Sequence, residues 1–201
     1  MKSVVLATGN THKKDEIRQI LADISVEILS PADLGVAIDV IEDGDSYAEN
    51  ALIKARAACR ATGMAAIADD SGIEVNALGG APGIRSARFA GHNSTDDENN
   101  LLLLSQMKDL PEREREARFV CAAVLVIPEE WEGEKEMVCT GEWHGMIGVH
   151  PEGRHGFGYD PLFVIPEEGA TAAELGEAYK REHSHRSKAF RALAEHLRAF
   201  D

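Results

Sequence analysis

Short apolar runs with strand character alternate along this chain with segments of helical spacing. Residues 3–7, SVVLA, predict a buried strand, and residues 11–22 predict a helix because Ile17, Ile20 and Ile24 recur at helical intervals. Further short strands are predicted at residues 25–29, 65–68 and 161–166. Because strands and helices interleave, the sequence predicts an α/β fold with a mixed sheet.

The strongest helix signal lies at residues 46–62. Ser46 and Glu49 have the spacing of a capping box, and Gly63 follows as a stop. Residues 94–107 predict a second capped helix, and a last helix is predicted from about residue 187 to residue 200. Residues 117–127 and 135–149 are rich in strand formers and flank the acidic stretch PEEWEGE, which predicts a long antiparallel hairpin with a polar tip.

Composition limits the classes of function. A chain of 201 residues, 44% of them hydrophobic, fits one domain or two tightly joined lobes. It has no apolar run long enough to span a membrane, and its first residues do not have the pattern of a signal peptide. Its three cysteines have no metal or disulfide spacing, so we expect reduced thiols in a cytoplasmic protein.

The net charge of −14 argues against non-specific binding of nucleic acid or of an anionic membrane. If the chain binds phosphates, it needs a local cluster of Lys and Arg side chains together with a divalent metal. Five segments of the chain are candidates for such a site, and each also has a purely structural alternative.

The opening loop is the first of these segments. A strand followed by Thr8, Gly9 and Asn10 and then a helix presents backbone N–H groups to an anion, and Lys13 adds a point charge. Gly9 would permit a tight turn and close approach of a ligand. The loop matches neither a Walker A sequence nor G-x-G-x-x-G. Alternatively, Asn10 or Thr11 only caps the helix and its lysines are solvated.

Lys54 flanks the small-residue face of the helix at residues 46–62. Such a lysine either points into a cleft or extends along the surface to keep its charge in water, and base rates favour the surface.

Acidic residues gather at two places in the sequence. Glu42 lies just before the helix at residues 46–62, and Asp69 and Asp70 follow the buried strand at residues 65–68, with DDSG separating that strand from the next. Neighbouring strand residues point to opposite sides, so we expect only one aspartate to face a given site. Mg²⁺ is commonly held by one or two carboxylates and substrate phosphates. A turn that caps backbone donors is the structural alternative.

Two segments near the C-terminal end complete the set. In HGFGYDP, residues 155–161, an aromatic face and a carboxylate could bind a purine, or the segment could be a Gly-rich turn with a core Phe157. The densest basic cluster, YKREHSHRSKA at residues 179–189, favours contacts with anions or base edges over a zinc site, although His183 and His185 could be read as ligands.

Taken together and in order, the motifs ATGNTHK, ENALIKA, ADDSG, GAPGIRSARF, FGYDPLF, TAAEL and SHRSKA resemble the inosine/xanthosine triphosphate pyrophosphatases. The resemblance runs from residue 4 to about residue 195. It implies a single NTP pyrophosphatase domain over residues 1–201, an elongated two-lobed α/β fold with a long central mixed sheet, and an active-site cleft between the lobes. It also implies a homodimer, dependence on Mg²⁺, and hydrolysis of ITP, dITP and XTP to the monophosphate and pyrophosphate.

The resemblance also implies roles for individual residues. Asp70 would be the general base and would bind metal with Glu42, while Lys13 and Lys54 would contact phosphates. The other implied substrate contacts are Thr8, Gly9, Asn10, Thr11, His12, Ser71, Phe157, Gly158, Tyr159, Asp160, Lys180, His185 and Arg186. A donor such as Arg186, or a backbone N–H, would favour the 6-oxo group of hypoxanthine and xanthine over the 6-amino group of adenine. Asp69→Asn is expected to affect the chemistry less than Asp70→Asn.

Two other functions are consistent with the same motifs. One is a nucleotide phosphohydrolase with little base preference, and the other is a nucleotide sensor that binds without turnover. The retained Asp70, Lys13 and Lys54 argue against the sensor.

Overall fold

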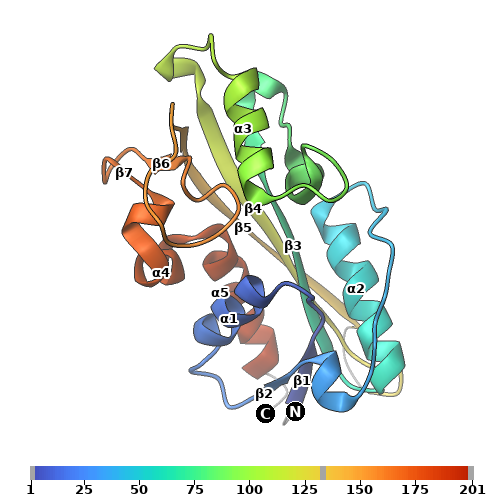
Figure 1. The fold of residues 1–201 in the computed structure, drawn as a ribbon. Helices are drawn as coiled ribbons and strands as arrows, with labels where there is room; N and C mark the ends of the chain where they lie inside the picture. The colour runs from blue at the N-terminus through green and yellow to red at the C-terminus, as the bar shows by residue number, and fades with distance from the viewer. Residues whose placement is uncertain (1–2, 132–134, 199–201) are drawn as a thin grey trace. The chain divides into compact units, whose positions relative to one another are not determined.

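The computed structural model of the protein describes residues 3–131 and 135–198. Within them, seven strands form one mixed sheet in the order β2-β1-β3-β4-β5-β6-β7 (Figure 1). β1 pairs in parallel with β2 and β3, whereas β6 pairs antiparallel with β5 and β7. The predicted α/β class with a mixed sheet is confirmed.

The bounds of the elements follow the predictions in most places. The strands are β1 (Ser3–Leu6), β2 (Glu27–Leu29), β3 (Ala66–Val75), β4 (Glu116–Val126), β5 (Glu136–Ile147), β6 (Phe163–Ile165) and β7 (Ala170–Thr171). The α-helices are α1 (Thr11–Ile20), α2 (Tyr47–Thr62), α3 (Asp96–Gln106), α4 (Ala172–His183) and α5 (His185–Arg198). The middle of the predicted hairpin tip, residues 132–134, and the end of the last predicted helix, residues 199–200, lie outside the described residues.

The chain divides into two compact units. Unit 1 is built from residues 1–70, 121–141 and 186–201 as far as they are described, and unit 2 from residues 71–120 and 142–185. The strands β3, β4 and β5 contribute residues to both units. The single domain and the cleft between lobes that the resemblance implies stay predictions.

In unit 1, helices cover both faces of the sheet. The alanines Ala51, Ala55 and Ala58 of α2 are fully buried in one core cluster with Ala66 and Ala68 of β3. On the other face, α1 and α5 pack against β1 and β3, and Figure 1 shows α2 on one side of β3 and these two helices on the other. The predicted start and stop of α2 are confirmed, since the Ser46 side chain accepts from the Glu49 N–H and Gly63 ends the helix with a φ of 65°.

The prediction that DDSG separates two strands is wrong, because β3 is one strand of ten residues that runs through it. Both ends of β3 are anchored in a core: Ile67 is fully buried in unit 1, and Ile73 and Val75 are fully buried in unit 2. Tertiary packing therefore overrides the weak strand propensity of Asp, Ser and Gly in its middle. Asp69 and Asp70 consequently lie within a strand rather than at its end.

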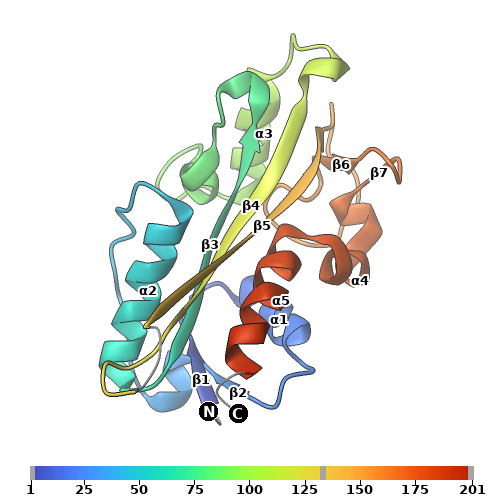
Figure 2. The ribbon, with the colours of Figure 1, turned by 180° about the vertical axis from the view of Figure 1, so that it is seen from behind.

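Unit 2 has a separate core, built from α3, the β6 region and one face of β3, β4 and β5. Phe119 of β4 and Trp143 of β5 belong to this core, with ring centroids 6.4 Å apart. The neighbouring Arg118 and His144 alternate to the other face, and Figure 2 shows no helix of unit 2 in front of this part of β4.

Two elements of unit 2 were not predicted. β7 has only two residues, and α4 contains a break at Gly176, which has a φ of 77° and a ψ of −173°. A glycine in the middle of a helical pattern weakens the sequence signal. None of the helices that the structure describes is long and apolar enough to cross a membrane.

Candidate active site

The opening loop of unit 1 brings α1 against β3. β1 ends at Leu6 and the Ala7 N–H donates to the Ile67 carbonyl at 2.8 Å, and β3 then extends beyond the end of β1. The Asn10 side chain caps α1 by accepting from the Lys13 N–H at 3.1 Å, and Thr8 Oγ1 accepts from the Asn10 N–H at 3.2 Å. The capping role of Asn10 is therefore confirmed.

Gly9 is not one of the glycines with positive φ, and a Cβ built at this position would meet nothing within 4 Å. The folded chain itself therefore does not require glycine in this turn. Open space beside the loop is consistent with close approach of a ligand, which stays a prediction.

Lys13 is not a solvated lysine. Its Nζ lies 3.1 Å from Asp69 Oδ2, and its side chain is 15% exposed. This ion pair holds the lysine at the first turn of α1 although the turn has no acidic residue. A positive charge at a helix N-terminus is unfavourable by itself, and the Asp69 carboxylate of β3 compensates the charge of Lys13.

Asp69 is the anchor of a buried ionic network. Its carboxylate also lies 3.4 Å from Arg186 Nε, and Arg186 Nη1 lies 2.6 Å from Glu16 of α1. Burial alone would raise the pKa of Asp69, but the cations of Lys13 and Arg186 outweigh it and hold the pKa well below the usual range. The Asp69 network therefore joins β3, α1 and α5.

Asp70 faces the opposite side of β3, towards α2, which confirms the predicted alternation. Its Oδ2 accepts from Asn50 Nδ2 at 3.3 Å, and its Oδ1 lies 3.9 Å from Lys54 Nζ. Asn50 and Lys54 are four residues apart on α2 and so share one face of the helix. The preference for a surface position of Lys54 is wrong, since its side chain is 14% exposed.

Glu42 belongs to the same cluster through the loop that precedes α2. Glu42 Oε2 lies 2.8 Å from Lys54 Nζ. The loop is held against the helix because the Gly44 N–H donates to Asn50 Oδ1 at 2.9 Å. A Cβ at Gly44 would lie 2.7 Å from Glu49 Cβ, so only glycine permits this close packing.

Sequence reasoning did not identify Asn50 as a site residue. It is 1% exposed and joins the loop at Gly44 to Asp70, which makes it a positioning residue for two members of the cluster. The sequence does contain a signal for this role, because an asparagine stands four residues before Lys54 on the alanine-rich face of the helix, where a polar side chain needs a hydrogen-bond partner.

The charges of this cluster perturb one another. Burial raises the pKa of Asp70, and the nearby cations of Lys54 and Lys13 only partly offset that effect. Burial alone would lower the pKa of Lys54, but the carboxylates of Asp69, Asp70 and Glu42 outweigh it and raise the pKa. Lys54 is thus a permanent cation and Asp70 a carboxylate whose proton affinity is higher than that of an exposed aspartate.

In unit 2, the segment HGFGYDP forms a loop held by its own aspartate. Asp160 Oδ2 accepts from the Phe157 N–H at 3.0 Å and from Lys180 Nζ at 2.6 Å, and Lys180 lies 4.8 Å above the Phe157 ring. Gly156 has a φ of 79°, and a Cβ there would lie 2.1 Å from Asp160 Oδ2. Phe157 is therefore half-buried beneath a cation, on a loop that requires glycine.

The remaining predicted residues of unit 2 lie at different depths. Tyr159 is buried, and its hydroxyl donates to the Ser86 carbonyl at 2.9 Å, which gives it a packing role. His185 is buried and stacks on Phe119, with ring centroids 4.7 Å apart. Ser71, the first residue of unit 2, is half-buried. Their contacts with a substrate stay predictions.

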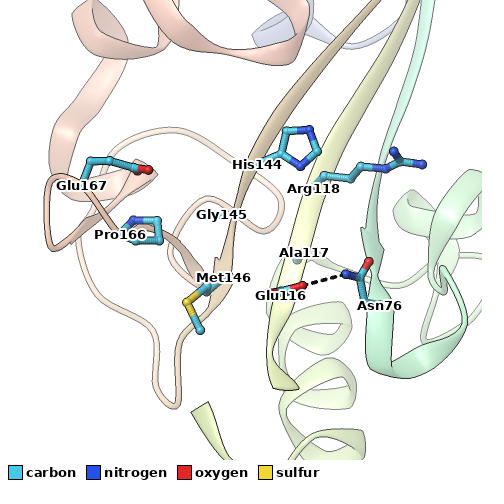
Figure 3. Close-up of a pocket in the computed structure, with 9 residues that line it drawn as sticks. All are labelled: Asn76, Glu116, Ala117, Arg118, His144, Gly145, Met146, Pro166 and Glu167. Atoms are coloured by element: carbon cyan, nitrogen blue, oxygen red, sulfur yellow. Dashed lines mark hydrogen bonds between the residues drawn. The ribbon is translucent and has the colours of Figure 1, made fainter. Parts of the chain in front are cut away.

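A cavity of about 460 Å³ in unit 2 lies elsewhere (Figure 3). Its described lining comes from the end regions of β3, β4, β5 and β6, and Glu116 accepts from Asn76 Nδ2 at 3.1 Å across it. None of the predicted site residues is part of that described lining, so the cavity gives no support to them.

Comparisons with known proteins show which family this chain resembles. The model of the Ham1 family matches residues 4–196. A protein of Shigella flexneri named dITP/XTP pyrophosphatase is 48% identical over 98% of this chain and 99% of its own length. The solved structure of a HAM1 protein from Coxiella burnetii has a TM-score of 0.87 and 38% identity, and covers 98% of both chains. The Staphylococcus aureus Ham1 protein has a TM-score of 0.86 and 36% identity, and covers all of both chains.

Proposed function

Because the chain belongs to the Ham1 family, we propose that it is a nucleoside triphosphate pyrophosphatase that hydrolyses dITP, ITP and XTP to the monophosphate and pyrophosphate. The observation that carries the proposal is the cluster of Glu42, Lys54 and Asp70 around one point of unit 1. Removing non-standard purine nucleotides from the pool would prevent their incorporation into DNA and RNA.

Asp70 is the general base of the proposed reaction. A carboxylate with a raised pKa accepts a proton from water more readily than an exposed one does. Asn50 orients it through Oδ2, and Lys54 compensates its charge. Hydrolysis of a triphosphate depends mainly on positioning and on neutralisation of charge, and Lys13 and Lys54 supply fixed cations for that purpose.

Glu42 and Asp70 are the proposed ligands of a divalent metal, Mg²⁺. The residues fit the group, since both carboxylates approach the same lysine and offer the hard oxygen donors that Mg²⁺ prefers. Among the described residues, no group of three or more His, Cys, Asp or Glu side chains could hold a metal. In the proposed site the other ligands of the metal would be substrate phosphates and water. The bound metal would neutralise phosphate charge and lower the pKa of water.

The N-terminal turn of α1 is the proposed phosphate site, made of residues 8–13. Its N–H groups and Lys13 would meet the triphosphate, with Asp69 holding the lysine in place. His12 is exposed in the same turn.

Gly9→Ala is a direct test of this loop. The chain itself has room for a methyl group, so we expect unchanged or slightly higher stability, by about 0.4 to 1 kcal/mol. If the triphosphate approaches the backbone closely, kcat/KM for ITP should fall by about 10²-fold. Urea unfolding and steady-state kinetics on the same variant separate the two effects. Full activity in a stable Gly9→Ala enzyme would contradict a phosphate contact at this position.

The base side of the proposed site is the Phe157 loop of unit 2. The aromatic face of Phe157 would stack on the purine, with Gly158, Asp160 and Lys180 around it. Arg186 is engaged with Glu16 and Asp69 in unit 1, which gives it a bracing role for α1. Its part in reading the 6-oxo group stays a proposal, as does a backbone N–H in that role.

The net charge of −14 supports a small-molecule substrate over nucleic acid. A homodimer, which the family resemblance implies, and a cytoplasmic location, which the spacing of the three cysteines suggests, complete the proposal.

Base preference distinguishes this function from a general phosphohydrolase. We expect kcat/KM for ITP and XTP to exceed that for ATP by about 10²-fold or more, because adenine would leave a buried donor unpaired. Initial rates with ITP, XTP, dTTP and ATP at saturating Mg²⁺ measure the preference. Similar values for all four would remove the proposed specificity, and tight binding of ITP without turnover would indicate a sensor.

A further inference from the structure

Two side chains of α3 hold both polar groups of one residue in the Phe157 loop. Asp96 Oδ2 accepts from the Gly158 N–H at 2.6 Å, and Asn100 Nδ2 donates to the Gly158 carbonyl at 2.9 Å. Asp96 and Asn100 are four residues apart and therefore share one face of the helix. We call this pair and its two hydrogen bonds the Gly158 clamp.

Gly158 needs such support because its backbone belongs to no regular element. Its φ is 62°, in the left-handed region, and it lies between Phe157 and Tyr159. The two neighbours are fixed from inside unit 2, Phe157 through its N–H to Asp160 and Tyr159 through its hydroxyl to the Ser86 carbonyl. The clamp fixes the residue between them from α3, so the backbone on both sides of the Phe157 side chain is held in place.

Asn100 has no other evident reason to be buried. It is 8% exposed, and its Oδ1 has no hydrogen-bond partner among the described residues. A buried amide with one unsatisfied oxygen costs stability, and an apolar side chain would avoid that cost. Four leucines follow it directly, so an apolar residue would suit this helix. The presence of an acidic residue at position 96 has a second explanation, since Asp96 lies in the first turn of α3, where a negative charge stabilises the helix by itself.

We propose that Asp96 and Asn100 are positioning residues that set the affinity for the nucleotide base by fixing the Phe157 ring through Gly158. The inference rests on the proposed function, in which Phe157 stacks on the purine. Neither side chain has a role in water activation or charge neutralisation in the proposed reaction, so the chemical step is not expected to depend on them.

The test compares Asp96→Ala, Asp96→Asn and Asn100→Leu with wild type and with Asp97→Ala. Asp97 is exposed and also lies in the first turn of α3, so its variant controls for the loss of an acidic residue there. We expect Asp96→Ala and Asn100→Leu to raise KM for ITP by about five- to tenfold, the range that loss of a good aromatic contact gives, with kcat within about twofold. Asp96→Asn keeps an acceptor and should recover most of the affinity.

Two measurements without turnover complete the test. Hydrogen exchange of the peptide over residues 155–162 should quicken in Asp96→Ala but not in Asp97→Ala, and the Kd for IMP should rise in parallel with KM. Equal effects of Asp96→Ala and Asp97→Ala, unchanged Kd, or a fall in kcat alone would overturn the clamp's role. Wild-type protein that binds IMP but hydrolyses no ITP would contradict the proposed function and leave the clamp to be judged by exchange and binding.

Discussion

Asp70→Asn is expected to lower kcat for ITP by about 10²- to 10⁴-fold, the usual contribution of a general base. The asparagine has nearly the same shape and can still accept a hydrogen bond from Asn50, but it cannot take a proton from water or offer a charged ligand to a metal. The Asp70 side chain is 14% exposed, and its cationic neighbour Lys54 keeps an ion pair with Glu42 in the variant. The protein should therefore remain folded.

The measurement is steady-state kinetics with ITP and Mg²⁺, combined with urea unfolding of the same preparation. Glu42→Gln is the matched variant, because it removes the second proposed metal ligand and keeps Asp70. Both variants should require more Mg²⁺ for half-maximal rate, whereas Asp70→Asn alone should stay nearly inactive at saturating metal. Turnover near that of wild type in Asp70→Asn would exclude Asp70 as the base.

Asp69→Asn is expected to act on stability, with a loss of about 3 to 5 kcal/mol, because it removes the carboxylate from a buried ionic network. Arg186 is 2% exposed and would lose one of its two carboxylate contacts described above while it keeps Glu16, and Lys13 would lose the contact that holds it at α1. Asp69 is therefore expected to matter less than Asp70 for proton transfer and more than Asp70 for the stability of the fold.

The pH dependence of this effect has a definite sign. The pKa of Asp69 is lowered in the folded protein, so the unfolded chain binds more protons in the acid range. The stabilisation is complete above the unfolded pKa of about 3.9 and is lost as pH falls through the lower folded value. The free energies of unfolding of wild type and Asp69→Asn, measured with urea, should therefore differ by the full amount at neutral pH. The difference should shrink progressively as the pH falls below about 4. A difference that is the same at all pH values would contradict the ionic origin.

The sequence predicted features set by neighbouring residues. The caps of α2 and α3 are examples, because Ser46 and Thr95 each act on a backbone N–H three residues away. Alternation along β3 correctly separated Asp69 from Asp70, since it depends only on the pleat of a strand. Local patterns also raised Lys13 and Lys54 as candidates, and the family resemblance then assigned roles to them and to the remaining site residues.

Features set by distant residues were not predictable in the same way. Arg186 meets Glu16 and Asp69 across 170 and 117 positions of the chain, and no local pattern pairs them. Asn50, Asp96 and Asn100 are polar residues whose partners are a loop backbone or a strand, so helical spacing alone assigned them no role. The continuity of β3 depends on packing at both of its ends, which outweighs the local preference of DDSG for a turn.

The most direct test of the central claim is identification of the products from ITP. The enzyme is incubated with ITP and Mg²⁺, and the products are separated by ion exchange and identified by phosphorus NMR, with Asp70→Asn as the inactive control. The account predicts IMP and pyrophosphate in equal amounts, formed by wild type and not by the variant. IDP and orthophosphate as the products, or equal yields from both proteins, would contradict it.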